Sequence, residues 1–335
     1  MVDYQKNKIL VRNFHGDLDN AIGDDVTGVL DRYTTKDYFF RGVHPFNEQQ
    51  GAGAVADVFW NPLGRAFQPI QRRQDIFMAG ASIIDGAEWV CSMGHLVGLF
   101  DEDWLGIPPS RKMTFLRYAE FNRITDGKIS ETGFFCDIIS VMQQAGVSPL
   151  PPQTGAALLT PGPLTHDGLL FEEQDPAETD QTSKLINQML QELTESDLHS
   201  SRDELTKTWH EDMIWFGPAG VGATYTLDRY EEQHQGPFKD GLANIKFHGH
   251  VCHFSEGNYA GWFGWPNLTM TPSGGFMGLP ASNRTVEMRV VDIYRREGNK
   301  LAENWIFIDL LHFLKQQGLD VLKRNRRLPA TRDRN

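Results

Sequence analysis

Two segments of this chain repeat one another, and this repeat constrains the fold more than any other feature of the sequence. Residues 106–146 and 278–318 align without a gap at a constant offset of 172 residues (106 to 278, 146 to 318). The coinciding pairs are Gly106 with Gly278, Arg117 with Arg289, Glu131 with Glu303, Phe135 with Phe307, and Asp137 with Asp309. A gapless match of this length indicates a duplicated domain.

The repeat extends upstream with a slightly different offset. Residues 37–42 (DYFFRG) fall opposite residues 212–217 (DMIWFG), at an offset of 175 (37 to 212). A chain of 335 residues has room for two domains of about 150 residues each. We therefore divide the chain into a first domain over 1–146, a Pro- and Gly-rich linker over 147–180, a second domain over 181–322 and a basic tail over 323–335.

Each half shows the same order of predicted elements. Helical patterns come first, and in the second half Thr182 or Ser183 is the expected N-cap. Strand-like segments follow, and each half ends in a hairpin, with turns TDGK and REGNK, before a short amphipathic helix. The prolines of the linker exclude helix and central strand there. The predicted fold class is α+β, with a curved antiparallel sheet wrapped over helices around a cone-shaped cavity.

Composition excludes several classes of protein. The net charge of −12 argues against nucleic acid as a partner, and we interpret the basic tail as a solvated terminus. No apolar run approaches the ~20 residues that a membrane span needs, so no membrane partner is expected. The N-terminus lacks the apolar core of a secretory signal. Cys91, Cys136 and Cys252 are too few for a disulfide framework, and we expect buried thiols and a cytoplasmic location.

Several short motifs carry a family resemblance. The pairs GIPPS and GLPAS, DGKISE and EGNKLAE, and QQAG and QQG, together with RGVHPFNE and WFGPAGVG, cover both halves. The chain resembles the SnoaL-like polyketide cyclases of the nuclear transport factor 2-like superfamily. The resemblance implies two tandem cone-shaped α+β barrels, each with a ligand cavity, and chemistry without a metal or another cofactor. It also implies that the two halves pack as an intramolecular pseudo-dimer, with further homodimerisation left open.

In these cyclases, one Asp near the end of the final strand acts as general acid and base in an aldol closure. The matching residues here are Asp137 and Asp309. The family also shows a His that His95, in MGHLVG, resembles in position, whereas the second half has GWPNLT with Asn267 nearby. The resemblance therefore implies catalytic carboxylates in both halves, while the loss of the His from the second half puts identical chemistry in doubt.

The alternation of side chains along the last strand also places Asp309 on a face with aromatic residues. Glu303, Trp305, Phe307 and Asp309 share one face, and residues 304, 306 and 308 share the other. We expect the first face to line the cavity, where apolar walls would raise the pKa of Asp309 toward neutrality. In the first half, Gly133 replaces the tryptophan, which predicts a wider cavity.

The alternative for both aspartates is helix capping. Asp137 and Asp309 each stand immediately before an amphipathic helical run, where a carboxylate accepts main-chain N–H groups. Capping lowers a carboxyl pKa, whereas a proton shuttle needs a raised one. From the residues alone, the two interpretations remain equally open.

Other side chains are candidates for the pocket wall. An inward Arg117 or Arg289 would orient a ligand oxygen, although ion pairing is the commoner role. We expect two or three of the five tryptophans of the second half to line a cavity, the others being core residues. The remaining candidates for ligand contact, each with a structural alternative, are Trp215, Trp262, Trp305, His234, His95, His44 and Trp60.

A zinc site is a weaker alternative. His248, His250 and Cys252 alternate as if on one strand face, but the first half has no equivalent. The sequence thus favours a cyclase- or isomerase-like enzyme acting on a small oxygenated ring compound, with Asp309 as the proton carrier. A non-catalytic ligand-binding protein and an Asp- and water-dependent hydrolase of an epoxide or ester remain open.

Overall fold

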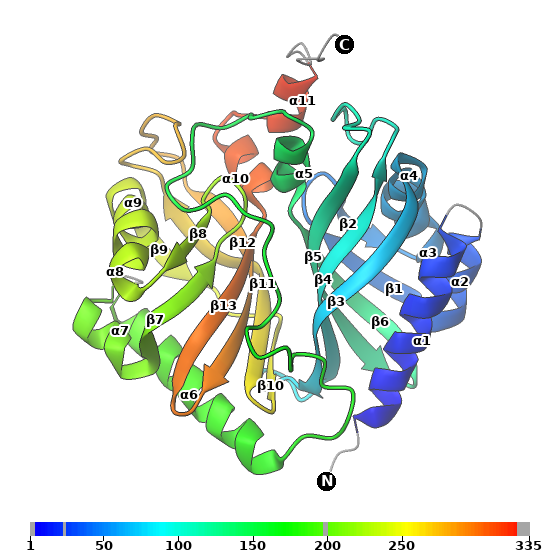
Figure 1. The fold of residues 1–335 in the computed structure, drawn as a ribbon, viewed down its shortest axis with the longest axis horizontal. Helices are drawn as coiled ribbons and strands as arrows, with labels where there is room; N and C mark the ends of the chain where they lie inside the picture. Colours follow the sequence, from blue (N-terminus) through cyan, green and yellow to red (C-terminus); the bar gives the residue numbers. More distant parts are fainter. Residues whose placement is uncertain (1–3, 23–24, 197–199, 327–335) are drawn as a thin grey trace.

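The computed structural model describes the chain except for residues 1–3, 23–24, 197–199 and 327–335. Two curved sheets stand next to each other, and most of the helices cover their outer faces (Figure 1). The segment between the two halves runs along the surface of both, and the short helices α5, α10 and α11 gather at the end where the C-terminus lies. The α+β class is confirmed.

The first half begins with a helix whose apolar residues recur at helical spacing. Val11, Phe14 and Leu18 are buried against the sheet, which fixes the side of α1 that faces inward. The elements of this half are α1 (Gln5–Ala21), α2 (Val26–Tyr33), β1 (Thr34–Gly42), β2 (Asn47–Gln50), α3 (Ala52–Val55), η1 (Ala56–Trp60), α4 (Asn61–Ala66), β3 (Phe67–Ala81), β4 (Glu88–Phe100), β5 (Met113–Thr125), β6 (Lys128–Cys136) and α5 (Ile138–Gln144).

The second half repeats this order. Its elements are α6 (Pro176–Glu195), α7 (Arg202–Thr208), β7 (Trp209–Phe216), β8 (Ala223–Tyr225), α8 (Leu227–Tyr230), η2 (Glu231–Gln235), α9 (Gly236–Gly241), β9 (Ala243–Phe247), β10 (Cys252–Glu256), β11 (Tyr259–Thr271), β12 (Val286–Glu297), β13 (Lys300–Ile308), α10 (Leu310–Gln316) and α11 (Val321–Asn325). The π-helical turns η1 and η2 coincide at the offset of 175 (56 to 231).

The sheets are mixed, whereas the sequence predicted purely antiparallel ones. The strand order is β2-β1-β6-β5-β4-β3 in the first half and β10-β11-β12-β13-β7-β8 in the second, with β9 also paired to β11. In each half, the first strand pairs in parallel with the last strand, β1 with β6 and β7 with β13. The two hairpins β5–β6 and β12–β13 have the predicted turns.

A helix begins inside the segment predicted as the linker, and its cap is a different residue from the one predicted. Helix α6 starts at Pro176, and Asp175 accepts a hydrogen bond from the main-chain N–H of Ala177. Thr182 lies inside the helix and bonds to the carbonyl of Gly257, so the expected cap at Thr182 or Ser183 was wrong. Proline at the first helical position is favourable because it has no N–H to leave unpaired.

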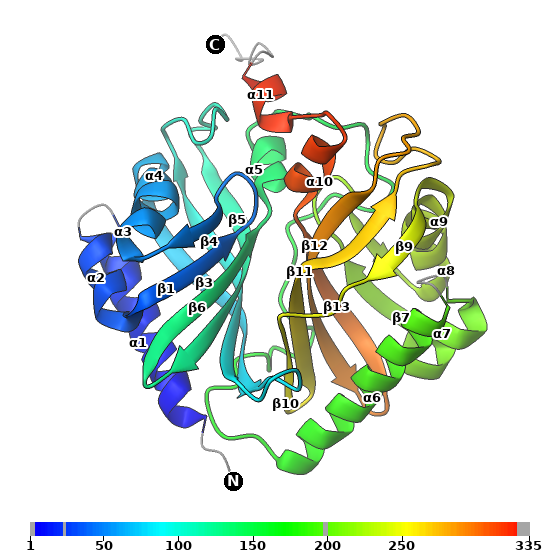
Figure 2. The same ribbon diagram turned by 180° about the vertical axis from the view of Figure 1, so that it is seen from behind.

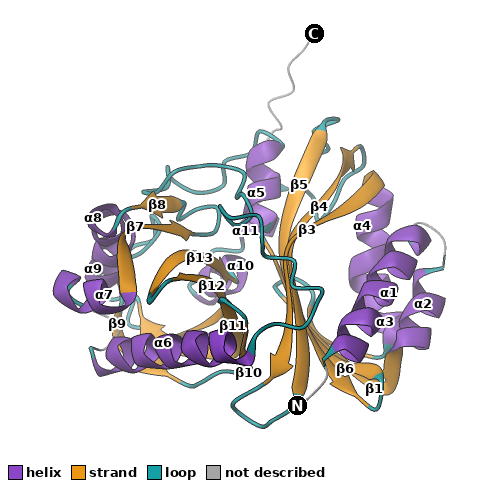
Figure 3. Ribbon diagram, turned by 60° about the horizontal axis from the view of Figure 1, so that its bottom comes forward, coloured by secondary structure: helices purple, strands orange, loops and turns teal. Residues whose placement is uncertain are grey.

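The two sheets face one another in the middle of the molecule, with the helices outside (Figures 2 and 3). Phe263 of β11 lies within ring-contact distance of three first-half side chains, Trp89, Phe121 and Phe135, at 5.6, 5.4 and 6.2 Å between ring centroids. The buried Lys8 Nζ donates to Glu256 Oε1 of the other half at 2.5 Å. The apolar faces that meet here explain why both sheets are buried on this side.

The exact domain boundaries stay a prediction, and most of the basic tail, residues 327–335, lies outside the described residues. In the described part of the chain, no helix combines the length and the apolar character that spanning a membrane requires. All three cysteines are free and buried, as expected.

Candidate functional site

A cavity of about 150 Å³ lies inside the second half, between the sheet and the helices α6 to α9. A cavity of about this volume accommodates one benzene-sized ring. Three of the five tryptophans of this half line it, which agrees with the two or three that the sequence predicted. The aromatic residues of its wall are Trp209, Trp215, Tyr230, Phe238, Phe247, Trp262 and Tyr294.

The rings of the wall are held against each other in pairs. Trp215 stacks on His234 with 3.9 Å between centroids and 23° between planes, and Trp262 stacks on Tyr294 at 4.7 Å. Trp209 contacts Tyr294 at 5.6 Å. Because each ring is fixed by a neighbour, the cavity has preformed flat walls suited to a ring-shaped ligand.

One carboxylate, that of Asp292, lies in this aromatic wall. Asp292 belongs to β12, where Met288, Val290, Asp292 and Tyr294 alternate onto the cavity face. The amide of Asn304, on the neighbouring strand β13, donates to Asp292 Oδ1 at 3.0 Å. Asp292 is only 8% exposed, so its environment is that of the cavity.

Burial raises the pKa of Asp292 from 3.8 to about 7, although hydrogen bonds from Asn304 and Tyr294 act to lower it. Desolvation disfavours the ionised carboxylate, and no cation offsets this effect. Burial also lowers the pKa of His234 and of His250 to about 3, so both rings are neutral near pH 7. The site can therefore hold or release one proton near neutrality, at Asp292.

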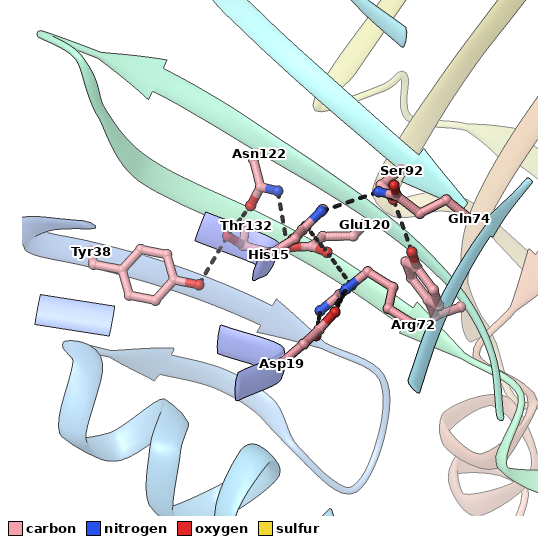
Figure 4. A network of polar contacts seen from close by, with 10 residues as sticks. His15, Asp19, Tyr38, Arg72, Gln74, Ser92, Glu120, Asn122 and Thr132 are labelled. Atoms are coloured by element: carbon pink, nitrogen blue, oxygen red, sulfur yellow. Dashed lines mark hydrogen bonds and ion pairs between the residues drawn. The ribbon is translucent and has the colours of Figure 1, made fainter. Parts of the chain in front are cut away.

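The duplicated half has a carboxylate at the same place but in a different environment. Glu120 lies 172 residues before Asp292 and pairs with Phe134, just as Asp292 pairs with Ile306 (134 to 306). Its Oε2 lies 2.9 Å from His15 Nε2 and 3.3 Å from Arg72 Nη1, and Asn122 donates to its Oε1 at 2.9 Å. Figure 4 shows the residues of this network and the contacts that join them.

The network reverses the effect of burial on the acid. Burial alone would raise the pKa of Glu120, but His15, Arg72 and Asn122 outweigh it and lower the pKa to about 2. Arg72 is further held by Asp19, with 3.1 Å from its Nη2 to Asp19 Oδ1. The predicted wide cavity around Gly133 was wrong, because Gly133 faces Phe263 of the other half, where an added Cβ would lie 2.8 Å from the ring.

The two aspartates proposed from the sequence do not lie in the cavity. Asp137 accepts the N–H of Ser140 at 3.0 Å with one oxygen and that of Ala219 at 2.7 Å with the other. Asp309 accepts the N–H groups of His312 and His44 at 3.1 and 2.9 Å in the same way.

Each aspartate therefore caps its own helix and binds the backbone of the opposite half. The main-chain N–H groups of Ala219 and His44 donate the hydrogen bonds to the opposite half. These two residues are themselves related by the offset of 175 (44 to 219). Burial raises the pKa of Asp309, but both its oxygens are occupied by main-chain donors. Neither carboxylate lines this cavity, so the geometry favours the capping interpretation for both residues.

The alternation along β13 was predicted correctly, but the cavity lies on its other side. Asn304, Ile306 and Ile308 line the cavity, whereas Trp305 packs on Phe216 at 5.5 Å and donates to the carbonyl of Pro161. Phe307 lies under the guanidinium of Arg117 at 4.1 Å, in the contact between the halves. Trp305 was therefore wrongly assigned to the pocket.

The two matched arginines also lie at the contact between the halves. Arg117 donates to the carbonyls of Phe216 and Gly217 at 3.1 and 3.4 Å. Arg289 donates to Asp309 at 3.3 Å, and its guanidinium lies 3.9 Å from the ring centroid of Trp265. Arg289 does not line the aromatic cavity of its half, and Arg117 lines only a small hollow in the contact between the halves.

Of the remaining candidates, Trp215, Trp262 and His234 lie in the cavity wall. Trp60 is buried in the core of the first half against Phe59, at 4.8 Å. His95 pairs with Asp75 at 3.4 Å in a small hollow of the contact between the halves. The ring of His44 lies 3.4 Å from Lys315 Nζ. These last three are structural residues.

The premise of the zinc alternative was wrong. Residues 248–251 do not form a strand, and His248 bonds to the hydroxyl of Thr269 at 2.8 Å instead of sharing a face with Cys252. Within the described residues, no group of three His, Cys, Asp or Glu side chains is placed to hold a metal ion.

The sequence did contain a signal for Asp292 that the motif comparison passed over. An acid stands alone in the apolar run VVDIY, and the repeat aligns it with Glu120. A charged residue in a buried strand is rare unless it is paired or functional. Alternation would then have added Tyr294 on the same strand.

Residues 185–317 match the sequence model of the family described as SnoaL-like polyketide cyclase. No curated protein matches the chain. Among solved structures, a SnoaL-like protein from Jannaschia sp. CCS1 is similar at 21% identity, with 45% of this chain and 96% of that chain covered and a TM-score of 0.34. An NTF2-like protein from Burkholderia xenovorans LB400 is similar at 16% identity, with 41% and 96% covered and a TM-score of 0.33.

Proposed function

We propose that this chain, whose second half is a SnoaL-like domain, binds a small oxygenated ring compound in the aromatic cavity of that half and that Asp292 moves a proton on it. The reaction class is metal-free general acid and base catalysis, of the isomerisation or aldol cyclisation type. The observation that carries the proposal is a buried carboxyl group with a pKa of about 7 in the wall of this cavity.

A carboxyl group suits this task when its pKa lies near the working pH, because it then both accepts and returns a proton readily. Asp292 meets this condition, and the amide of Asn304 holds its Oδ1 at 3.0 Å. In the ionised form, Asp292 would take a proton from the carbon next to a ring carbonyl. It would return the same proton at a more distant carbon of the resulting enolate.

The cavity also supplies a group for the oxygen of such a substrate. Tyr230 lines the cavity, and its hydroxyl is able to donate to a carbonyl or enolate oxygen. Burial raises the pKa of Tyr230, so it remains a donor at neutral pH. The volume of about 150 Å³ and the flat walls favour a compound with one ring.

The test is the isomerisation of 3-cyclohexen-1-one to 2-cyclohexen-1-one, followed by the ultraviolet absorbance of the conjugated product. One C–H bond breaks next to the carbonyl and one forms at the far end of the former double bond. We expect Asp292→Asn to lower the rate by about 100-fold or more. Asp228→Asn, a change at a side chain that is 70% exposed, is the matched control and should leave the rate unchanged.

Equal rates for wild type and Asp292→Asn would reject the proposal. Asp309→Asn is included because the sequence pointed to it. If Asp309→Asn abolished the reaction while Asp292→Asn did not, the proton carrier would be the helix-capping carboxylate instead.

A further inference from the structure

Among the described residues, the carboxylate of Asp292 has no counterpart of the arginine and histidine that bind Glu120 in the first half. Glu120 is held by Arg72 and His15, with 3.3 and 2.9 Å from its Oε2 to Arg72 Nη1 and His15 Nε2. Arg72 pairs with Leu96 in the first sheet, and Phe247 pairs with Leu268 in the second. Since Leu96 and Leu268 are related by the offset of 172 (96 to 268), Phe247 occupies the place of the arginine.

The second positive partner is also replaced. His15 projects from α1, and at the upstream offset of 175 (15 to 190) it corresponds to Leu190 of α6, which lines the cavity. Both replacements are apolar. The second half therefore has an aromatic cavity with a carboxylate where the first half has an ion-pair network.

Among the described residues that line this cavity there is no lysine or arginine. Its other ionisable side chains are Glu192 of α6, Glu204 of α7, Tyr230, His234, His250 and Tyr294. The two histidines have lowered pKa values and are neutral near pH 7. The charged groups that face the cavity are thus all acidic.

Aromatic faces add to this preference. A cation over a Trp or Tyr ring is attracted by the negative face of the ring, most strongly where water is excluded. Trp215 and Trp262 present such faces in the same cavity as the buried carboxylate of Asp292. An anionic ligand would meet a carboxylate with no positive group to offset it.

We propose that the cavity selects a ring compound that carries a positively charged ammonium group, which takes the place that Arg72 and His15 have beside Glu120 in the first half. Asp292 is its counter-ion, and the tryptophan faces cover its remaining surface. The inference rests on the same cavity as the proposed function and narrows the class of its substrate. It concerns binding, so it is tested without measuring a reaction.

Three probes of equal shape test the charge preference: benzylamine as the cation, benzyl alcohol as the neutral compound and benzoate as the anion. Their dissociation constants are measured at pH 8 by titration calorimetry and by quenching of tryptophan fluorescence. We expect benzylamine to bind at least tenfold more tightly than benzyl alcohol, and benzoate not to bind. In Asp292→Asn, the dissociation constants of benzylamine and benzyl alcohol should come within threefold of each other.

A second pair of variants changes Phe247 and leaves Asp292 in place. One of the two adds an arginine at the position that corresponds to Arg72. Phe247→Arg should weaken benzylamine at least tenfold, because the guanidinium satisfies the carboxylate as Arg72 does in the first half. Phe247→Leu is the matched control for loss of the ring, and it should weaken benzylamine and benzyl alcohol by the same factor. Thermal unfolding of each variant establishes that it is folded.

The outcomes separate the two proposals. Benzyl alcohol binding as tightly as benzylamine in wild type, or equal loss of benzylamine in both Phe247 variants, overturns the charge preference. Isomerisation of 3-cyclohexen-1-one that depends on Asp292 would still stand in that case. A cavity that prefers benzylamine but does not isomerise the ketone would reject the proposed reaction and keep the cation site.

Discussion

Replacing Asp292 with Asn is expected to stabilise the folded protein at pH 8. Burial raises the pKa of this group from 3.8 to about 7. Each pKa unit corresponds to about 1.4 kcal/mol, so the ionised carboxylate costs the folded state about 4 kcal/mol. The folded pKa lies above the unfolded one, so the folded protein binds the proton more tightly. The cost is therefore complete above pH 7, falls as the pH drops from 7 toward 4, and is absent below pH 4.

The corresponding change in the first half should have the opposite sign. The pKa of Glu120 is lowered from 4.5 to about 2, which amounts to roughly 3 kcal/mol of stability at neutral pH by the same conversion. That stability is present above pH 4.5 and is lost as the pH falls toward 2. Glu120→Gln should therefore destabilise the protein at pH 7, since it also removes the carboxylate that binds the buried side chains of Arg72 and His15.

The assay is urea unfolding of wild type and both variants between pH 5 and pH 8, followed by circular dichroism and tryptophan fluorescence. Differences between variant and wild type at one pH cancel the titration of all other groups. The gain from Asp292→Asn should shrink by about 2.5 kcal/mol from pH 8 to pH 5. A variant that is less stable than wild type at pH 8, or a difference that does not change with pH, would refute the reasoning about Asp292.

Three further predictions concern the reaction and the contact between the halves. The rate of 3-cyclohexen-1-one isomerisation in wild type should rise with pH through about 7 and level off above it, because the base must be ionised; a flat profile from pH 5 to 9 would exclude Asp292 as the base. Asp137→Asn and Asp309→Asn should each lower the free energy of unfolding by about 1–3 kcal/mol, measured by chemical unfolding. Each carboxylate accepts two main-chain N–H groups, one on each oxygen, whereas the asparagine amide has a single accepting oxygen. Phe263→Ala should cost about 3–5 kcal/mol in the same assay because it empties the ring cluster between the sheets, and a cost below 1 kcal/mol would show that the halves do not stabilise each other there.

Much of the fold could be predicted because duplication leaves a signal that needs no other sequence. The offset of 172 gave both hairpins and both final helices, and the short helices α5 and α10 coincide at that offset (138 to 310). The parallel pairing of β1 with β6 could not be predicted, because strand order depends on contacts between segments that are far apart in the chain. Alternation along β13 was likewise correct as a pattern of faces.

The site was harder to predict than the fold. Alternation along a strand tells which side chains share a face, but it does not tell which other part of the protein packs against that face. Asp309 and Trp305 lie on the face of the second sheet that turns away from its cavity, where they bond to His44 of the first half and to Pro161 of the segment between the halves. The contact between the halves buries this face, and the helices of each half cover the other one. Only the packing of the two halves therefore decides that Asn304 and Asp292, and not Asp309, face the cavity.

The two halves also show how one duplicated core reaches two different outcomes. Glu120 and Asp292 keep the same strand position, but Arg72 has become Phe247 in the second sheet. Where the second half has Phe247, it has a cavity and an acid whose pKa is raised to about 7. The first half has the ion-pair network in the corresponding place.

The most direct measurement is the titration of the Asp292 carboxyl carbon by ¹³C NMR, assigned by comparing aspartate-labelled wild type with Asp292→Asn. A midpoint near pH 7 is the result expected for a buried carboxyl group whose pKa is raised by desolvation. A midpoint below pH 5 would mean that the carboxylate is solvated or paired, and the proton transfer assigned to it would have no basis.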